Sequence, residues 1–374
     1  MLLDQILDRF AKWFSGMKKK KIPASVEPVG VKEIALRANV SLATVDRVLH
    51  NRTGVSDATR QKIQQIIKEL YYQPNILARV LASRKAYHFA VLIPKVSEET
   101  AFWQAPLKGI EKAEAEIGQY GIKISKFFFD QNDKKSFVEA SRQILETKVD
   151  GIIMAPSFIE ESINFTNTCK KLQIPYVFIN SDIPTQDSLC YIGPELFKSG
   201  YLAGNLASYG KLNSGKILVV NISKELDNHH HLLRKEEGFR KYFQDKDNSI
   251  PVIKVDIHQT EYRAVEEHLS RLLQEHPDIS IIFVTNSRVS TVAKYLEKTG
   301  RKGLLLIGYD YLPENIEYLR KEIINFLICQ KPEKQGFKGV MALFQNLVLQ
   351  TPVQPVHHMP IDIITKENFE FYRN

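Results

Sequence analysis

Residues 31–84 read VKEIALRANVSLATVDRVLHNRTGVSDATRQKIQQIIKELYYQPNILARVLASR, and this stretch decides how the first part of the chain folds. Two short helical patterns separated by a tight turn come first. A longer amphipathic helix follows, and then a short segment of basic and apolar residues. This order predicts a small three-helix head and a linker. From residue 89 onward the pattern changes, and it predicts a separate and larger domain.

The first two helices have the spacing of a helix-turn-helix. Asn39 follows the first helix, and Asn tolerates the left-handed backbone of a tight turn. Ser41 can cap the second helix, over about residues 42–50, because its hydroxyl accepts an orphan amide hydrogen. In a helix-turn-helix, the exposed residues at the start of this helix enter the major groove of DNA. Arg47 can pair with guanine, and Ala43 can touch a thymine methyl group.

The third helix begins at Ser56 or Asp57 and continues to about Leu70. Its isoleucines repeat at three- and four-residue spacing, which closes a small core. At its start, Ser56, Thr59 and Arg60 could hold phosphates.

A further short helix is expected after Asn75, which can cap it. The segment is too short to be helical by itself in water. It would fold only when DNA and a second copy of the chain support it. An exposed Leu81 on this helix could then push between base pairs in the minor groove and bend the duplex.

Charge is concentrated at the start of the chain. The 374 residues carry a net charge of +8. Residues 1–88 hold sixteen Lys/Arg against seven Asp/Glu, whereas the other residues hold 35 Lys/Arg and 36 Asp/Glu. A basic head on a neutral body fits binding to a polyanion, although a solvated basic face would give the same count.

Length and composition predict a soluble protein of two or three domains. The three cysteines are far apart and form no C-x-x-C pair, so we expect no thiol metal site and a reducing, cytoplasmic location. No apolar run approaches the length that spans a membrane. The first sixteen residues, in an extension over 1–30, leave three interpretations open: an amphipathic docking helix, a weakly ordered tail, or a translation start at Met17. The basic stretch after them is expected to be a disordered arm.

Strand patterns alternate with amphipathic helices after residue 87. This arrangement predicts parallel sheets that helices cover on both faces, in two similar lobes with a cleft between them. No phosphate-binding glycine loop, G-x-S-x-G or H-E-x-x-H motif occurs, so we expect neither an enzyme nor a cofactor. The expected strands are 89–94, 122–129, 151–156, 176–180, 215–220, 252–257, 279–286 and 304–310.

The head resembles the DNA-binding head and hinge of the lactose-repressor family. The matching blocks are V-K-E-I-A-x-x-A-N-V-S-x-A-T-V-x-R-V-L at 31–49, V-S-x-x-T-R at 55–60 and Y-x-P-N-x-x-A-R-x-L at 72–81. The resemblance implies a homodimer on a near-palindromic operator, with paired hinge helices in the minor groove. Asp46 stands where the family often has Ser, so operator preference cannot be copied. The predicted DNA contacts are Ser41, Leu42, Ala43, Thr44, Arg47, Ser56, Thr59, Arg60, Asn75, Ala78, Arg79 and Leu81.

The body, over about 89–365, resembles the effector domain of that family and the ribose-type periplasmic sugar-binding proteins. The strand order, a block at 234–239, I-G-Y-D at 307–310 and I-x-Q-x-P at 328–332 carry the resemblance. Asn180 stands where sugar-binding relatives often have Asp, so an acidic or polyol effector stays possible. The predicted effector-binding residues are Phe102, Trp103, Asn180, Asp182, Arg234, Asn286, Asp310 and Gln330. We expect the run His229–His231 to contact the effector or to form a loop at the rim of the cleft, and to bind no metal.

These features predict an all-α helix-turn-helix head (31–74), a hinge and linker (75–88) and a two-lobed α/β effector and dimerisation domain (89–374). The chain is expected to cross between the lobes near 190, 323 and 350. The predicted function is a cytoplasmic DNA-binding repressor of a carbohydrate-use operon under allosteric control by a sugar-like molecule. A sugar carrier and a sugar-modifying enzyme on the same fold are the alternatives.

Overall fold

The computed structural model describes residues 30–49, 52–70, 72, 85–97, 101–210, 215–224, 230–246 and 250–374. Two compact units make up the chain, residues 1–76 and 77–374, which we call the head and the body. Most of the expected N-terminal extension and of the hinge, with its predicted DNA contacts from Asn75 to Leu81, lies outside the described residues. Within the described part of the chain, no helix is long and apolar enough to cross a membrane.

Three helices form the head: α2 (Val31–Ala38), α3 (Leu42–Leu49) and α4 (Asp57–Glu69). Asn39 ends α2 with a φ of 54°, in the left-handed region that Asn adopts more readily than most residues. This residue therefore makes the tight turn that the sequence predicts. One apolar core joins the three helices, with these buried members: Ile34, Ala35, Ala38, Val45, Val48, Ile63 and Ile66.

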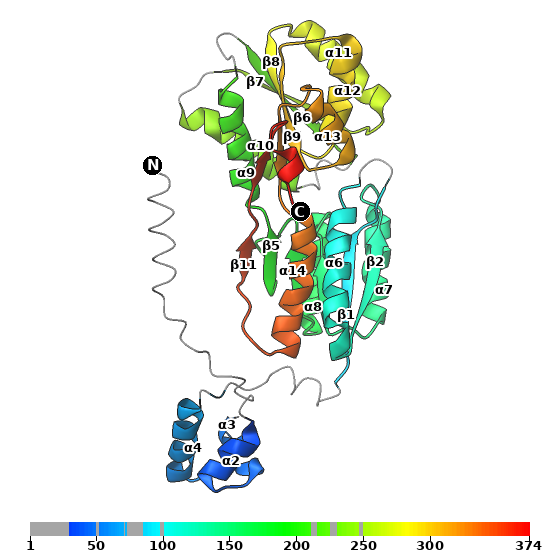
Figure 1. Cartoon of the computed structure of the whole chain (residues 1–374). Coiled ribbons are helices and arrows are strands. Elements are labelled where there is room, and N and C mark those ends of the chain that lie inside the picture. The colour runs from blue at the N-terminus through cyan, green and yellow to red at the C-terminus, as the bar shows by residue number, and fades with distance from the viewer. Residues whose placement is uncertain are drawn as a thin grey trace, which may run out of the picture. The chain divides into compact units, whose positions relative to one another are not determined.

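Two six-stranded sheets form the body, one in each lobe (Figure 1). The N-lobe sheet has the order β11-β5-β4-β3-β1-β2, and all its pairings are parallel. Buried, mostly apolar strands fill its centre, as expected for a parallel sheet that is covered on both faces. Its strands are β1 (Tyr87–Pro94), β2 (Ile122–Phe129), β3 (Gly151–Met154), β4 (Tyr176–Ile179), β5 (Cys190–Gly193) and β11 (Val356–His358).

The C-lobe sheet repeats this plan with the order β12-β10-β9-β8-β6-β7. Its pairings are parallel except that between β10 and β12, which is antiparallel. Its strands are β6 (Lys216–Ile222), β7 (Val252–Ile257), β8 (Ile279–Val284), β9 (Leu305–Tyr309), β10 (Phe326–Cys329) and β12 (Asp362–Ile364).

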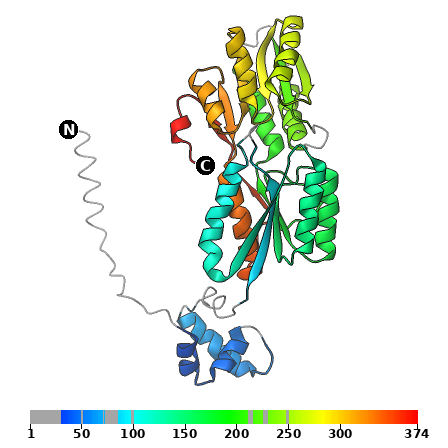
Figure 2. The same cartoon turned by 90° about the vertical axis from the view of Figure 1, so that its right-hand side faces the viewer.

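Helices lie on both faces of each sheet, as the two perpendicular views show (Figures 1 and 2). The N-lobe helices are α6 (Gln104–Ile117), α7 (Lys134–Glu146), α8 (Ile159–Lys171) and α14 (Pro332–Leu343). The C-lobe helices are α9 (Leu196–Ser208), α10 (His230–Asp245), α11 (Tyr262–Glu275), α12 (Val289–Thr299) and α13 (Pro313–Arg320). Separate apolar clusters fill the spaces between sheet and helices, so each lobe has its own core.

The chain passes between the lobes three times. These crossovers follow β5, β10 and β11 and lie at residues 194–195, 330–331 and 359–361. They come several residues later than the expected positions near 190, 323 and 350. The difference arises because the short strands β5, β10 and β11 belong to the sheets that the chain is leaving.

All eight expected strands are present, and their ends differ from the expected ones by at most two residues. Four further strands, β5, β10, β11 and β12, were not expected, and they have only three or four residues each. A segment of this length has too few side chains to show a periodic pattern, and β3 and β4, which also have four residues, were expected only as parts of the longer runs 151–156 and 176–180. Only the neighbouring strand makes such a short segment part of a sheet.

In each lobe, one pair of helices packs backbone against backbone at glycines. In the N-lobe, a Cβ at Gly109 of α6 would lie 1.8 Å from the carbonyl oxygen of Glu333, in α14. In the C-lobe, a Cβ at Gly200 of α9 would lie 1.8 Å from the carbonyl oxygen of Lys235, in α10. Gly336 and Gly238 meet the facing helix of each pair in the same way, at Pro106 and Phe197. A side chain at any of these positions would push the two helices apart.

Replacement of Gly200 tests this close approach. We expect Gly200→Ala to lower the free energy of unfolding by about 1–3 kcal/mol, because the new methyl group overlaps backbone that cannot move cheaply. Urea unfolding followed by circular dichroism measures the change. Gly118→Ala is the matched control, because Gly118 has helical backbone angles and no atom within 4 Å of the place that a methyl group would take. A Gly200→Ala protein as stable as this control would contradict the close packing of α9 on α10.

Candidate functional sites

One face of α3 is exposed in the head. Leu42, Ala43 and Arg47 are all exposed, whereas Val45 and Val48 on the opposite face are buried in the core. The guanidinium group of Arg47 has no ion-pair partner among the described residues. A donor group of this kind on an exposed helix face suits contact with a guanine edge or a phosphate.

The N-terminal ends of α3 and α4 have the same cap. The hydroxyl of Ser41 accepts a hydrogen bond from the backbone N–H of Thr44 at 3.2 Å, and the hydroxyl of Ser56 accepts one from the N–H of Thr59 at 3.3 Å. In each case the Ser and Thr hydroxyl groups are also hydrogen-bonded to each other. These four residues therefore fix where the helices begin. Their predicted DNA contacts would come in addition to this structural role.

Two charged residues of the head differ from the simple expectation. Asp46, which stands where the family often has Ser, is half-buried and forms a 3.2 Å ion pair with Arg52. Arg60, a predicted phosphate contact, donates a 2.9 Å hydrogen bond to the backbone carbonyl of Arg52. Both interactions hold the segment between α3 and α4, so these residues also shape the exposed face of α3.

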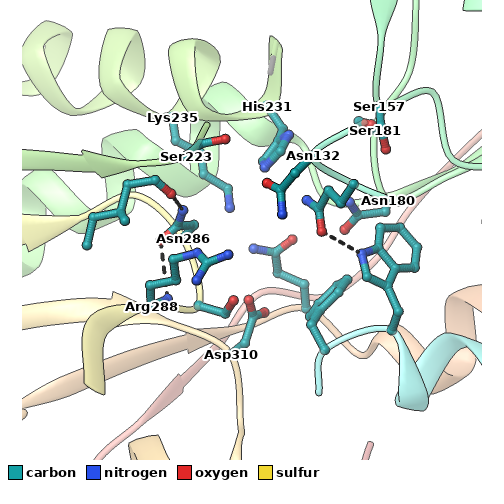
Figure 3. Close-up of a pocket in the computed structure, with 16 residues that line it drawn as sticks. Asn132, Ser157, Asn180, Ser181, Ser223, His231, Lys235, Asn286, Arg288 and Asp310 are labelled. Atoms are coloured by element: carbon teal, nitrogen blue, oxygen red, sulfur yellow. Dashed lines mark hydrogen bonds between the residues drawn. The ribbon is translucent and has the colours of Figure 1, made fainter. Parts of the chain in front are cut away.

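A polar pocket lies between the two lobes of the body (Figure 3). Most of its lining residues follow the carboxyl ends of parallel strands, which is where open α/β sheets place their ligands. The lining residues are Phe102, Trp103, Gln131, Asn132, Ser157, Asn180, Ser181, Ile222, Ser223, His231, Lys235, Asn286, Ser287, Arg288, Asp310 and Gln330.

Six of the eight predicted effector-binding residues line this pocket: Phe102, Trp103, Asn180, Asn286, Asp310 and Gln330. Asp182 and Arg234 do not line it. The guanidinium of Arg234 pairs with Glu237 and lies 5.3 Å from the centre of the Phe197 ring. Lys235, the next residue, points into the pocket instead (Figure 3).

Lys235 lines the pocket and Arg234 does not because the two residues stand at different distances in sequence from Gly238. The block reads RKEEGF, so Arg234 is four residues before Gly238 and Lys235 is three residues before it. Consecutive residues on a helix point about 100° apart, so neighbours face different surroundings. The direction of each side chain depends on how α10 is rotated, and the Gly238 contact with α9 determines that rotation.

The other ten lining residues were not among the predicted effector-binding residues, although His231 belongs to the run that was expected at the cleft. Most of them lie one to three residues after a strand end, for example Asn132 after β2 and Ser223 after β6. A wider search of polar residues after each strand would have found these. His231 and Lys235 come from the first turns of a helix, and no strand pattern points to them.

Asn180 and Asp310 occupy equivalent places in the two lobes. Asn180 follows β4 with a φ of 69°, and Asp310 follows β9 with a φ of 72°. The backbone N–H of each residue donates a hydrogen bond to a carbonyl of the neighbouring strand. Asn180 donates to Ile192 in β5, and Asp310 donates to Ile328 in β10. Both residue types tolerate the left-handed backbone. The pocket thus has an amide from one lobe at the place where the other lobe supplies a carboxylate.

Lys235 is a buried cation in the pocket wall, with an exposed fraction of 5%. Its Nζ donates a 3.2 Å hydrogen bond to the carbonyl oxygen of Thr285 and lies 3.7 Å from the centre of the Tyr309 ring. The Tyr309 hydroxyl accepts a 3.0 Å hydrogen bond from Ser199, in α9. The ring that faces the ammonium group is therefore held in place.

A buried polar cluster joins α10 to the ends of three strands, β6, β7 and β8. The amide of Asn221 donates to Glu236 at 3.0 Å and to Asp256 at 2.8 Å, and its oxygen accepts a 2.6 Å bond from the Thr285 hydroxyl. Buried polar groups of this kind are costly unless they are hydrogen-bonded. The cluster therefore positions the helix turn that carries Lys235.

Burial shifts the pKa values of the two charged groups that meet in the pocket. It raises the pKa of Asp310 to about 6, although the charge of Lys235 acts in the opposite direction. Burial also lowers the pKa of Lys235 to about 8, and Asp310 offsets part of this effect. For each group, the attraction of the opposite charge therefore offsets only part of the cost of burial.

Amide groups hold the loops that carry these side chains. The Asn286 side chain donates to the carbonyl of Ile222 at 2.7 Å and accepts from the N–H of Arg288 at 3.2 Å. The fully buried Asn315 donates to the backbone carbonyls of Tyr309, Asp310 and Ser287. The loops after β8 and β9 are therefore tied together.

Two aromatic residues close the pocket on the N-lobe side. Trp103 is buried, and its indole N–H donates a 3.3 Å hydrogen bond to the side-chain oxygen of Gln131. Phe102 packs edge-on against it, with 5.1 Å between the ring centres. An aromatic wall with many amides, hydroxyls and a few charges suits a polar ligand that presents both C–H faces and hydroxyl groups.

Two family descriptions match the chain. Residues 30–75 match "Bacterial regulatory proteins, lacI family", and residues 89–350 match "Periplasmic binding protein domain". Catabolite control protein A of Priestia megaterium is 27% identical over 342 residues, which cover 83% of this chain and 98% of that protein. The ribose operon repressor of Halalkalibacterium halodurans is 26% identical over 291 residues, covering 76% of this chain and 80% of that one.

Solved structures agree with these matches. A glucose-galactose binding protein, GanP of Geobacillus stearothermophilus, superposes on 76% of this chain and 99% of its own with a TM-score of 0.67 at 26% identity. A LacI-type transcriptional regulator of Bacteroides fragilis superposes on 77% of this chain and 100% of its own, with a TM-score of 0.72 and 30% identity. With its matching head and its matching two-lobed body, the chain belongs to the lacI family of bacterial regulatory proteins.

Proposed function

We propose that this protein represses a carbohydrate-use operon by binding a specific DNA sequence, and that a sugar-like effector in the body pocket controls the binding. The observation that carries this proposal is the combination of two sites in one chain. The head exposes Leu42, Ala43 and Arg47 on one helix face, and the body surrounds a pocket with amides, hydroxyls and a tryptophan. A reader of DNA joined to a receptor for a small molecule is what a ligand-controlled regulator requires.

On the DNA side, we propose that a homodimer places two copies of α3 in successive major grooves of a near-palindromic operator. Arg47 reads one guanine in each half-site, and Leu42 and Ala43 contact neighbouring bases. The hinge would add contacts in the minor groove, through the predicted residues Asn75, Ala78, Arg79 and Leu81. The cytoplasm is the compartment in which such a protein meets its operator.

On the effector side, we propose a shift between two conformations of the body. Pocket residues come from both lobes, so an effector that binds them stabilises a closed arrangement of the lobes. The crossover at residues 330–331, which contains Gln330, leads directly into α14, so closure at the pocket also acts on the N-lobe. A change in the spacing of the two N-lobes in a dimer would then alter the support of the hinge helices on DNA.

The names of similar proteins support a carbohydrate link. They include a ribose operon repressor and a glucose-galactose binding protein. An exported carrier and a sugar-modifying enzyme have the same body fold as alternatives, but neither accounts for a helix-turn-helix head. Multiple-turnover loss of a candidate sugar would favour the enzyme.

Selection of bound sequences from a random DNA pool, at one fixed and moderate salt concentration, tests the function directly. We expect a near-palindromic motif with a flexible step at its centre. Genes next to genomic copies of the motif would then identify the regulated operon. Recovery of no motif, together with binding that disappears as salt increases, would leave only a basic head and would contradict the proposal.

Arg47→Ala tests the reading of a base by α3. We expect the variant to lose about 1–3 kcal/mol of operator affinity and to relax the preference at one base pair in each half-site. Fluorescence anisotropy on the operator, on operators changed at single positions and on random DNA measures both effects. Lys68→Ala, which removes one charge from an exposed position on α4, controls for net charge. Equal weakening on operator and random DNA would make Arg47 a phosphate contact.

The ionisation of Asp310 predicts a pH effect on the ligand-free protein. Because burial raises the pKa of this carboxyl from 3.8 to about 6, the native state binds a proton that the unfolded state has already released between these pH values. Stability from this group therefore falls as pH rises through that window. Asp310→Asn removes the effect, and Asn still tolerates the left-handed backbone. Relative to the natural chain, the variant should gain about 1–3 kcal/mol in unfolding free energy between pH 4 and 7.

Urea unfolding at several pH values measures this difference. Asp187→Asn is the control, because Asp187 is an exposed carboxylate whose pKa is lowered by Lys170. Asp187→Asn should therefore lower the unfolding free energy relative to the natural chain as pH rises, whereas Asp310→Asn should raise it. A difference for Asp310→Asn that does not change with pH would mean that the carboxyl is not strained by burial.

A further inference from the structure

The charged residues of the pocket are predominantly positive. Among the lining residues that the structure describes, the ionisable ones are His231, Lys235, Arg288 and Asp310. Two of these are permanent or near-permanent cations at neutral pH, one is an imidazole and only one is an acid. The remaining polar lining consists of neutral amides and hydroxyls. Among these described lining residues, cationic side chains therefore outnumber carboxylates.

The replacement of a carboxylate by an amide contributes to this excess. Asn180 and Asp310 hold equivalent positions at the ends of β4 and β9, with nearly the same backbone angles and hydrogen bonds. A second acid at position 180 would have balanced the two cations. With Asn there, the described lining residues of the N-lobe are neutral, and the permanent charges among the described lining residues come from the C-lobe.

Lys235 is the cation for which compensation matters most. It is nearly fully buried, and its Nζ is satisfied only by a backbone carbonyl and an aromatic ring, with no ion pair to a described carboxylate. A buried charge is costly unless an opposite charge accompanies it. Figure 3 shows the ammonium group of Lys235 and the side chains of Arg288 and Asp310 directed toward the same part of the pocket. An anionic group of a ligand would fit next to Lys235 and Arg288, while Asp310 accepts hydrogen bonds from hydroxyl groups.

We propose that the effector is an anionic sugar derivative, a sugar acid or a sugar phosphate, whose negative group binds Lys235 and Arg288. This inference rests on the proposed function and specifies the chemical class of its effector. Lys235 acts as the residue that distinguishes the acid from the neutral sugar of the same shape. The carboxylate and the phosphate share the required chemistry, namely several acceptor oxygens with a full negative charge.

The test compares matched pairs of ligands on the full-length protein by calorimetry, which needs no DNA. Glucuronate is paired with glucose, galacturonate with galactose, gluconate with glucitol, and the terminal phosphates of ribose and glucose with the parent sugars. Sodium phosphate alone serves as the control for a bare anion. We expect at least one charged ligand to bind roughly 10- to 100-fold more tightly than its neutral partner, the range for one charge-assisted hydrogen bond. Tight binding of the uronates or of gluconate would identify a sugar acid as the effector, and tight binding of the phosphates would identify a sugar phosphate.

Three variants assign the preference to Lys235. Lys235→Gln should remove the ratio between charged and neutral ligand, and Lys235→Arg should retain most of it. Arg234→Gln is the matched control, because it removes one positive charge from the next residue of the same helix, outside the pocket. This control should leave the ratio unchanged. Thermal unfolding of each variant establishes that it is folded before binding is measured.

The outcomes separate the inference from the proposed function. Neutral sugars that bind as tightly as their acids, no binding by any charged ligand, or an unchanged ratio in Lys235→Gln would each overturn the anionic effector. If a neutral sugar alone released the selected operator, the anionic effector would be overturned, but the proposed function as a ligand-controlled regulator would be supported. Conversely, a sugar acid that binds by calorimetry, with no operator recovered from the DNA pool, would support the inference about the ligand and contradict the regulator.

Discussion

The close approach of two helix pairs at glycines is the constraint on which the body pocket depends. Gly109 and Gly336 let α6 touch α14, and Gly200 and Gly238 let α9 touch α10. The helices α6 and α10 begin at the pocket and bring Trp103 and Lys235 to it, whereas α9 and α14 continue from crossovers between the lobes. The carbonyl that Gly200 approaches belongs to Lys235 itself. Any side chain at this contact would therefore move a pocket wall together with its support.

The two lobes have nearly the same plan but do not contribute the same chemistry. Strand order, the left-handed residues after β4 and β9, and the backbone hydrogen bonds that hold them are repeated. On this repeated frame, one lobe presents aromatic rings and amides and the other presents Lys235, Arg288 and Asp310. An asymmetric ligand would have one preferred orientation in such a pocket, because its charged end has only one matching wall. This asymmetry is what makes a chemically specific effector reasonable on a fold that many ligands share.

The head combines structure and recognition within a few residues. Ser41, Thr44, Ser56 and Thr59 cap the helices, and Asp46, Arg52 and Arg60 hold the segment between them. These contacts leave Leu42, Ala43 and Arg47 exposed on a rigid surface. A small core of seven buried residues is enough for this purpose, because the surface has to present only one helix face. Asp46 illustrates how a departure from the family pattern can serve an internal ion pair.

The sequence by itself determined the features that follow from local periodicity and local chemistry. These are the three helices of the head, the Asn39 turn, the Ser caps and eight strands of the body. Together with the family resemblance, the sequence also predicted six pocket residues, four of which closely follow strands. Only the tertiary structure decided which short segments, such as β11 and β12, join a sheet, and where the crossovers lie. It also decided that Lys235 rather than Arg234 faces the pocket. The reason is geometric, because the rotation of a helix about its axis comes from what it packs against. For α10 that partner is α9, which it meets at Gly238 and at Gly200, and Gly200 is far away in the sequence.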